Sequence, residues 1–371
     1  MRYFSKKNSF LVVLILLVLT TGVVSLVLLK QTPVIVYQNS PTAQTALTSP
    51  TPTPYALPPI PSSKVLSNGG YHIFQSFNNC GPAALSMALR FYGINVGQAE
   101  LGLALRPYQI PGGDNDDKSV TLEELAEKSR EYGFIPYHRP MGNPEIVKHF
   151  IAQDMPVIAR TWTKPGEDIG HYRIIKGYDE VAETFLQDDS LQNKNLTYTY
   201  ADFNQIWKKF NYEYLVLVPK EKVEIANAIL GENADEKTAW QRARKNAEQE
   251  VAQNPTDITA RFNLSVAYFN TVQYQSAVDE FEKIESQLPF RTLWYQIEPI
   301  LAYYELGNYD RVFQITDRVL NNYNRAFSEL YILRGKIYLE RGQIDLARGE
   351  FQKAVFYNSN LRAAQDLLSS I

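Results

Sequence analysis

The stretch QSFNNCGPAALSMAL, residues 75–89, holds the only cysteine of the 371-residue chain. Pro82 suits the first turn of a helix, where its missing N–H costs nothing, and Gly93 suits the helix end. The residues between them are apolar on nearly all sides, so we expect a buried helix over 82–92. Cys80 stands two residues before this helix. A lone thiol there makes no intramolecular disulfide, and the field at a helix N-terminus favours the nucleophilic thiolate.

A thiol nucleophile needs a base, and the chain has four histidines for that role: His72, His138, His149 and His171. His171 opens a β-branched run that leads into a turn at 177–180, and the next strand ends at Asp188 and Asp189. If residues 171 and 189 face each other across this hairpin, a carboxylate can orient the imidazole. Either Asp fits, and we favour Asp189.

Gln75 precedes the cysteine by five residues. Its side-chain amide could join the backbone N–H of Cys80 as an oxyanion hole. Together with His171 and Asp189, these residues would supply a nucleophile, a base, an orienting carboxylate and an electrophilic donor.

Two motifs resemble those of the bacteriocin-processing (double-glycine leader) type of cysteine peptidase domain. They are Gln-x4-Cys-Gly-Pro-Ala-Ala-Leu from residue 75 and Gly-His-Tyr-Arg-Ile-Ile-Lys-Gly-Tyr-Asp from residue 170, followed by Asp-Asp-Ser from 188. The resemblance covers about 65–219. It implies a papain-like fold in which Cys80 is the nucleophile, His171 the base, Asp189 the orienting group and Gln75 the oxyanion donor.

The sequence departs from that family at two points. The family's Gln stands six residues before the cysteine, whereas Gln75 stands five before Cys80. The transport-coupled members also carry membrane spans and an ATPase, and this sequence has no such module after the domain. The resemblance therefore does not imply a leader peptide as substrate.

The rest of the region 64–220 indicates an α+β domain. Amphipathic patterns predict two helices after the buried one, and β-branched or aromatic runs predict strands later in the region. These elements are the helices 120–132 and 144–153 and the strands 156–162, 171–176, 184–187 and 214–218.

The region 223–371 is predicted to be all-α, and it repeats. Equivalent residues recur about 35 positions apart, with a turn inside each unit, in the way typical of tetratricopeptide repeats. We expect about four units, the first degenerate, stacked into a superhelix. The equivalent sets are Tyr268, Tyr303 and Tyr338; Ala277, Val312 and Ala347; and, at the turns, Val272, Gly307 and Gly342.

The N-terminal residues predict a membrane anchor. Positions 10–29 are twenty residues without a charge, long enough for a helix of about 30 Å that spans a bilayer. The cations before this span predict a cytoplasmic N-terminus and main domains outside the cytoplasm. A cleaved signal peptide is the alternative, although the residues after Leu29 are a poor cleavage context. Residues 1–30 would be the stub and anchor, and the Pro-rich stretch 31–63 a linker.

Composition and loop sequence argue against two further kinds of ligand, nucleic acid and metal ions. The net charge of -3 gives no reason to expect nucleic acid as a partner. The acidic loop at 112–117 lacks the distal Glu of a calcium loop, so we predict a solvated loop and no metal or cofactor.

The function predicted from these features is that of a membrane-anchored cysteine peptidase. Its substrate would be a peptide or protein, and the repeats would recruit that substrate or another protein partner. Two alternatives stay open. One is a catalytically weak papain-like scaffold, and the other is acyl transfer to an amine by the same residues.

Overall fold

A computed structural model describes residues 57–110 and 119–371. The predicted anchor at 10–29, most of the linker 31–63 and the acidic loop at 112–117 lie outside the described residues. Among the residues described, no helix is both long enough and apolar enough to cross a membrane.

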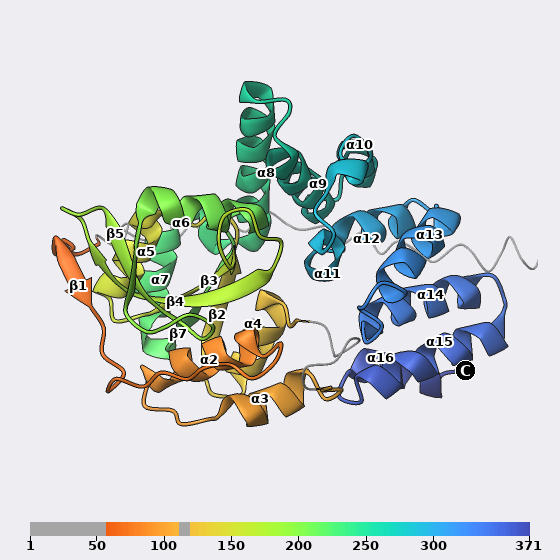
Figure 1. Cartoon of the computed structure of the whole chain (residues 1–371), viewed down its shortest axis with the longest axis horizontal. Helices are drawn as coiled ribbons and strands as arrows, with labels where there is room; N and C mark the ends of the chain where they lie inside the picture. The colour runs from red at the N-terminus through yellow and green to blue at the C-terminus, as the bar shows by residue number, and fades with distance from the viewer. Residues whose placement is uncertain (1–56, 111–118) are drawn as a thin grey trace, which may run out of the picture. The chain divides into compact units, whose positions relative to one another are not determined.

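The strands of the first domain form one antiparallel sheet (Figure 1). Within the described residues its order is β2-β7-β3-β4-β5-β6, and β1 pairs with β4 beside this path. The strands are β1 Ser63–Val65, β2 Ile135–Arg139, β3 Val157–Trp162, β4 Gly170–Asp179, β5 Thr184–Asp189, β6 Leu196–Thr199 and β7 Tyr214–Val218.

Helices cover both faces of this sheet. Val157 and Ala159 of β3 belong to one apolar cluster with α5 and α6, while Ile158 points into another with α2 and α4. Side chains of a strand alternate between the two faces, so a strand covered on both sides is apolar throughout. The helices are α2 Cys80–Arg90, α3 Gln98–Leu105, α4 Leu122–Arg130, α5 Pro144–Ala152, α6 Tyr200–Trp207 and α7 Val223–Leu230.

Most of the predicted elements of this domain are present, and β2 is the clearest omission. His138 lies in β2, for which no strand was predicted. This strand contains Pro136 and two basic residues, a composition that hides a strand in the sequence. An edge strand tolerates proline because one side of its backbone needs no partner, and β2 is the outermost strand of its side of the sheet.

The second domain consists of paired helices, as the repeat pattern predicts. The turn positions Val272, Gly307 and Gly342 all have left-handed backbones, with φ of 62°, 70° and 70°. Each of these turns reverses the chain between the two helices of a pair. The helices are α8 Glu236–Gln253, α9 Ile258–Asn270, α10 Tyr274–Glu282, α11 Thr292–Tyr295, α12 Glu298–Glu305, α13 Tyr309–Leu320, α14 Ser328–Glu340, α15 Ile344–Tyr357 and α16 Arg362–Ser369.

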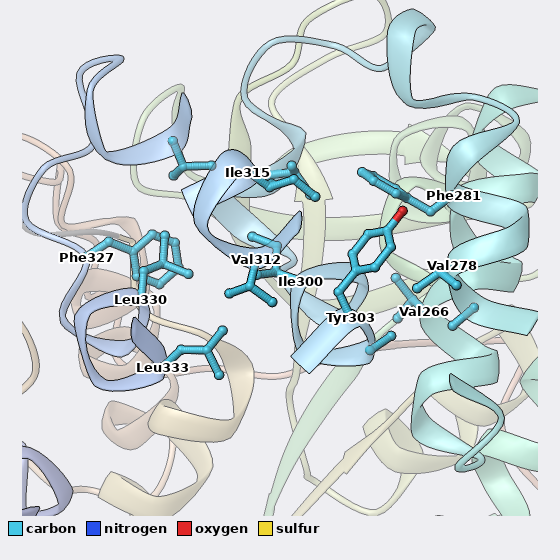
Figure 2. Close-up of a cluster of buried hydrophobic side chains, with 14 of the residues drawn as sticks. Val266, Val278, Phe281, Ile300, Tyr303, Val312, Ile315, Phe327, Leu330 and Leu333 are labelled. Atoms are coloured by element: carbon cyan, nitrogen blue, oxygen red, sulfur yellow. The ribbon is translucent and has the colours of Figure 1, made fainter. Parts of the chain in front are cut away.

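One apolar core runs through the repeats (Figure 2). It joins side chains of successive helix pairs, such as Val266 of α9, Tyr303 of α12 and Leu330 of α14. The small residue Ala277 has no exposed surface, which allows close approach of its helix. Because each pair buries its apolar face against the next, the pairs stack as a repeat protein does.

The two domains pack against each other within one compact unit, Pro54–Ile371. Near the start of the repeats, Asn263 Nδ2 donates to the carbonyl of Lys208 at 2.7 Å. Near the end, Asn360 Nδ2 donates to the carbonyl of Leu103 in α3 at 2.9 Å. The repeats therefore contact the first domain through residues that lie far apart along the repeat region.

Candidate active site

Cys80 is the first residue of α2, so the helix begins two residues earlier than Pro82, where the sequence placed its start. Asn79 takes the N-cap position, and its carbonyl accepts a hydrogen bond from the N–H of Ala83 at 2.9 Å. The Asn79 side chain is itself held, because Arg106 Nη1 donates to its Oδ1 at 2.8 Å. The cap fixes where the helix starts, and Cys80 lies within the field of its N-terminus.

Gly81 lets this helix end approach its neighbours closely. A Cβ at this position would lie 2.2 Å from Cγ2 of Val120 and 3.4 Å from the ring of Tyr172. Any side chain at 81 would therefore clash with Val120, just before α4. Cys80, beside it, is only 4% exposed.

His171 is the second residue of β4, and its ring has two partners among the predicted residues. Its Nε2 lies 2.8 Å from Oδ1 of Asp189. Cys80 acts on the same ring, because it helps to raise the pKa of His171. The structure thus brings together three of the predicted site residues, one from α2, one from β4 and one from β5.

Of the two candidate carboxylates, Asp189 contacts His171 and Asp188 does not. Asp188 instead pairs with Lys176, whose Nζ lies 2.6 Å from its Oδ1. The hairpin register differs from the expected one, since Asp189 lies opposite Arg173. A bulge between Ile175 and Gly177, together with the longer β4, moves the pairing by two residues. A shift of two keeps Asp189 on the His171 face of the sheet, so the contact forms diagonally.

Asp189 is fixed by more than the imidazole. Its Oδ1 accepts hydrogen bonds from the N–H groups of Leu191 at 2.7 Å and Gln192 at 2.9 Å. Its Oδ2 lies 2.6 Å from Nη1 of Arg173, an ion pair that is not aligned as a hydrogen bond. Both side chains are fully buried. The carboxylate can therefore orient the His171 ring without moving itself.

These contacts shift two proton equilibria. Burial alone would lower the pKa of His171, but the hydrogen bonds and charges of Asp189 and Cys80 outweigh burial and raise it. Burial would likewise raise the pKa of Asp189, yet His171, Arg173 and the backbone lower it to about 2. Asp189 stays ionised beside a ring that accepts a proton readily, which is the arrangement a thiol nucleophile requires.

Gln75 lies beside the end of β5. Its Oε1 accepts from the hydroxyl of Ser190 at 2.9 Å, and its N–H donates to the carbonyl of Ser190 at 2.8 Å. Among the hydrogen bonds of the described residues, none joins Gln75 to Cys80. The amide of Gln75 is held next to the His171–Asp189 strand end, and its Nε2 is the part not used by Ser190.

Several residues around the site were not singled out from the sequence. Arg173 could have been found, because it stands two residues after His171 and so shares its face of β4. Ser190 and Arg106 carry no such signal, because they lie just after the ends of β5 and α3. His72 was a candidate base, but it contacts the backbone of Asp189 instead. His72 Nε2 lies 3.0 Å from the carbonyl of Asp189. In the parts of the chain described, 57–110 and 119–371, no group of His, Cys, Asp and Glu could hold a metal ion.

The fold and this site define a papain-like domain with a Cys–His–Asp arrangement. Residues 67–215 match the model of the Peptidase_C39 like family, which confirms the resemblance drawn from the two motifs. Residues 67–215 are thus similar to a C39-like peptidase domain, and paired helices with the repeat pattern follow it. Among curated protein sequences, the comparison found no match.

Solved structures resemble each domain separately. A protein from Bacillus anthracis titled as a C39-like peptidase shares 16% identity, covering 42% of this chain and 98% of its own, with a TM-score of 0.36. The peptidase domain of Streptococcus ComA shares 18% identity over 40% of this chain and 97% of its own, with a TM-score of 0.32. A repeat protein of Thermus thermophilus shares 18% identity over 36% of this chain and 74% of its own, with a TM-score of 0.29.

Proposed function

We propose that this protein is a cysteine peptidase that uses Cys80, His171 and Asp189. One observation carries the proposal: His171 Nε2 lies 2.8 Å from Oδ1 of Asp189, and Cys80 helps to raise the pKa of the same ring. The imidazole then has a carboxylate to fix its orientation and a thiol from which to take a proton. The match of 67–215 to the C39-like family supports the same chemistry.

The reaction begins when His171 takes the thiol proton and the Cys80 sulfur attacks the carbonyl carbon of a peptide bond. The C–N bond of the resulting tetrahedral intermediate breaks as His171 returns the proton to the amine that leaves. A thioester remains on Cys80. Water, deprotonated by His171, then attacks the thioester, and the acid product leaves with the thiol restored.

The oxyanion formed in both attacks needs hydrogen-bond donors. The backbone N–H of Cys80 belongs to the first turn of α2 and has no partner further back in that helix. Gln75 Nε2 is the second donor that we propose. Ser190 holds the carbonyl end of the same amide, which supports a fixed orientation for the donor end.

Peptide cleavage by the full chain in detergent tests this proposal. The substrate is a mixture of peptides from a protein digest, and products are read by mass spectrometry. We expect new termini with the wild type and none with Cys80→Ala. Gln75→Ala should cut at the same bonds but on the order of a hundredfold more slowly.

The same assay separates the two alternatives. Products joined to an added amine would identify an acyl transferase. An absence of any product, with Cys80 alkylated no faster than a small free thiol, would identify a scaffold and contradict the proposal.

We further propose that residues 10–29 anchor the protein in a membrane, with both domains on the side away from the cytoplasm. The uncharged run and the cations before it support this placement. A protease added to intact cells would degrade the domains if they lie outside, and would spare them if they lie inside. The repeats, as surfaces that bind proteins in many chains, would recruit the substrate or a partner.

A further inference from the structure

A short segment of the repeat domain reaches the candidate active site. The helix α11 carries Tyr295, and the carbonyl of Tyr295 accepts a hydrogen bond from Arg160 Nη2 of β3 at 2.5 Å. On the same segment, Arg291 Nη1 lies 2.6 Å from Oδ1 of Asp168, two residues before Gly170. This segment is held on both sides by residues of the peptidase domain.

The ring of Tyr295 lies against the residue that precedes the base. A Cβ built on Gly170 would lie 2.9 Å from Cδ1 and Cε1 of Tyr295. The Gly170 backbone also lowers the pKa of the Tyr295 hydroxyl. No side-chain atom fits between this ring and the start of β4. The ring therefore closes against the backbone of the residue directly before His171.

Tyr295 also lies within electrostatic range of Cys80. The pKa of Tyr295 is raised to about 12, mainly because the hydroxyl is buried. The Gly170 backbone lowers this pKa, and the charge of Cys80 raises it further. Cys80 and His171 are only 4% and 2% exposed. A covering group from outside the peptidase domain thus stands next to a catalytic pair that is almost closed to solvent.

The ring of Tyr295 is packed against neighbouring side chains, so a change of its rotamer would cost free energy. Phe210 meets it edge to face, with centroids 6.2 Å apart. Arg160, which holds the Tyr295 carbonyl, stacks on the same Phe210 with its guanidinium 4.5 Å from the ring centroid. Glu213 lies 3.3 Å from Arg160 Nη1 and fixes the guanidinium in turn. The backbone of Tyr295 is fastened to the peptidase domain, so its ring is a fixed part of the site.

We propose that Tyr295 is a wall of the active site, supplied by the repeat domain, that limits the size of the groups able to reach the Cys80 sulfur. Substrates with small side chains beside the attacked bond pass this wall, and bulky ones are excluded. The inference rests on the proposed function in taking Cys80 as the nucleophile.

Alkylation of Cys80 by two reagents tests the size limit without requiring peptide cleavage. The full chain is treated with iodoacetamide and with an iodoacetamide that carries a naphthalene ring. The rate at which each reagent alkylates Cys80 is divided by the rate at which the same reagent alkylates glutathione. This ratio removes the difference in intrinsic reactivity between the two reagents. We expect the wild type to favour the small reagent, and Tyr295→Ala to reduce that preference on the order of tenfold. Tyr295→Phe keeps the ring and should keep the preference.

Trp294→Ala is the matched control. It removes a large ring from the same helix, and this ring contacts Phe290 and Arg291 instead of Gly170. An unchanged preference in Tyr295→Ala, or an equal change in Trp294→Ala, would overturn the proposal. If Tyr295→Ala does not fold, Tyr295→Leu fills more of the space and should shift the preference in the same direction.

The proposed function can fail independently of this inference. In that case no variant cleaves peptides, while the ratio of the two alkylation rates still shows whether Tyr295 limits access to Cys80. Conversely, cleavage of peptides with bulky and small residues at equal rates by the wild type would contradict the wall and leave the peptidase intact.

Discussion

The two domains differ in what they bury. Within the described residues, the peptidase domain buries the charged side chains Arg106, Lys148, Arg160, Arg173, Lys176, Asp188, Asp189 and Glu213. The repeat domain buries one, Glu350, beside apolar groups and a few uncharged polar side chains. Removing a charge from water costs several kcal/mol, roughly, unless a partner compensates. The repeats avoid this cost, whereas the peptidase domain accepts it around His171.

This difference indicates where function constrains the fold. Arg173 and Asp189 form an ion pair without contact to solvent, and that pair holds the carboxylate that orients His171. An apolar pair of the same size could fill the space, but it could not orient an imidazole. The buried pair of Arg173 and Asp189 therefore serves the geometry of the site, and the apolar repeat core serves stacking.

The largest predicted effect follows from breaking the buried pair. Arg173→Met leaves the Asp189 carboxylate without its cation, which we expect to cost the peptidase domain about 3–5 kcal/mol of unfolding free energy. Hydrogen exchange read by mass spectrometry, region by region, separates this loss from the stability of the repeats.

Arg334→Met is the control in the repeats. Arg334 lies 3.1 Å from Glu350, but its side chain is 13% exposed and Lys353 also pairs with Glu350. Its loss should cost about 1 kcal/mol. Equal costs at the two positions would contradict the contrast between the domains.

The sequence predicted the repeats more completely than the site. Repeat contacts are local, and the residues at Val272, Gly307 and Gly342 recur with the turns they form. The Cys80 and His171 motifs were equally visible, because helix starts and strand starts have sequence signals.

What could not be predicted depends on contacts between distant segments. The bulge near Ile175 changed the hairpin register, and nothing local in the sequence marks it. Tyr295 reaches Gly170 across 125 positions of sequence, because 295 - 170 = 125. Its place beside Gly170 depends on how two domains pack, which no periodicity or motif encodes.

A smaller effect is expected from pH. The pKa of Asp189 falls from 3.8 to about 2 on folding, so its contribution is complete above pH 4, approximately, and is lost as pH falls toward 2. The shift corresponds to about 2 kcal/mol. The raised pKa of His171 acts in the opposite sense, because its contribution is complete at low pH and is lost as pH rises through the folded pKa.

Urea unfolding of the wild type and of Asp189→Asn, followed from pH 6 to pH 2.5, isolates the carboxylate. The wild type should be the more stable at pH 6, and its advantage should shrink by up to about 2 kcal/mol as the pH falls. A constant difference across this range would mean that Asp189 does not titrate as the ion pair requires.

The smallest effect tests the repeat core, where packing and not charge sets stability. A Cβ at Gly335 of α14 would lie 2.4 Å from Cε1 of Phe351, a fully buried ring of α15. Gly335→Ala overpacks this contact at a cost that the gain in helix propensity only partly offsets, so we expect a net loss of about 1 kcal/mol. Hydrogen exchange in α14 and α15 measures it.

Gly349→Ala in α15 provides the comparison, because nothing lies within 4 Å of a Cβ at that position. There the substitution only removes glycine's freedom in the unfolded chain and should stabilise the repeats by about 0.5–1 kcal/mol. The two substitutions are chemically identical and should act with opposite signs. A gain at both positions would mean that α14 and α15 pack more loosely than the Gly335–Phe351 contact requires, and the repeat core would then owe its stability to propensity instead of close packing.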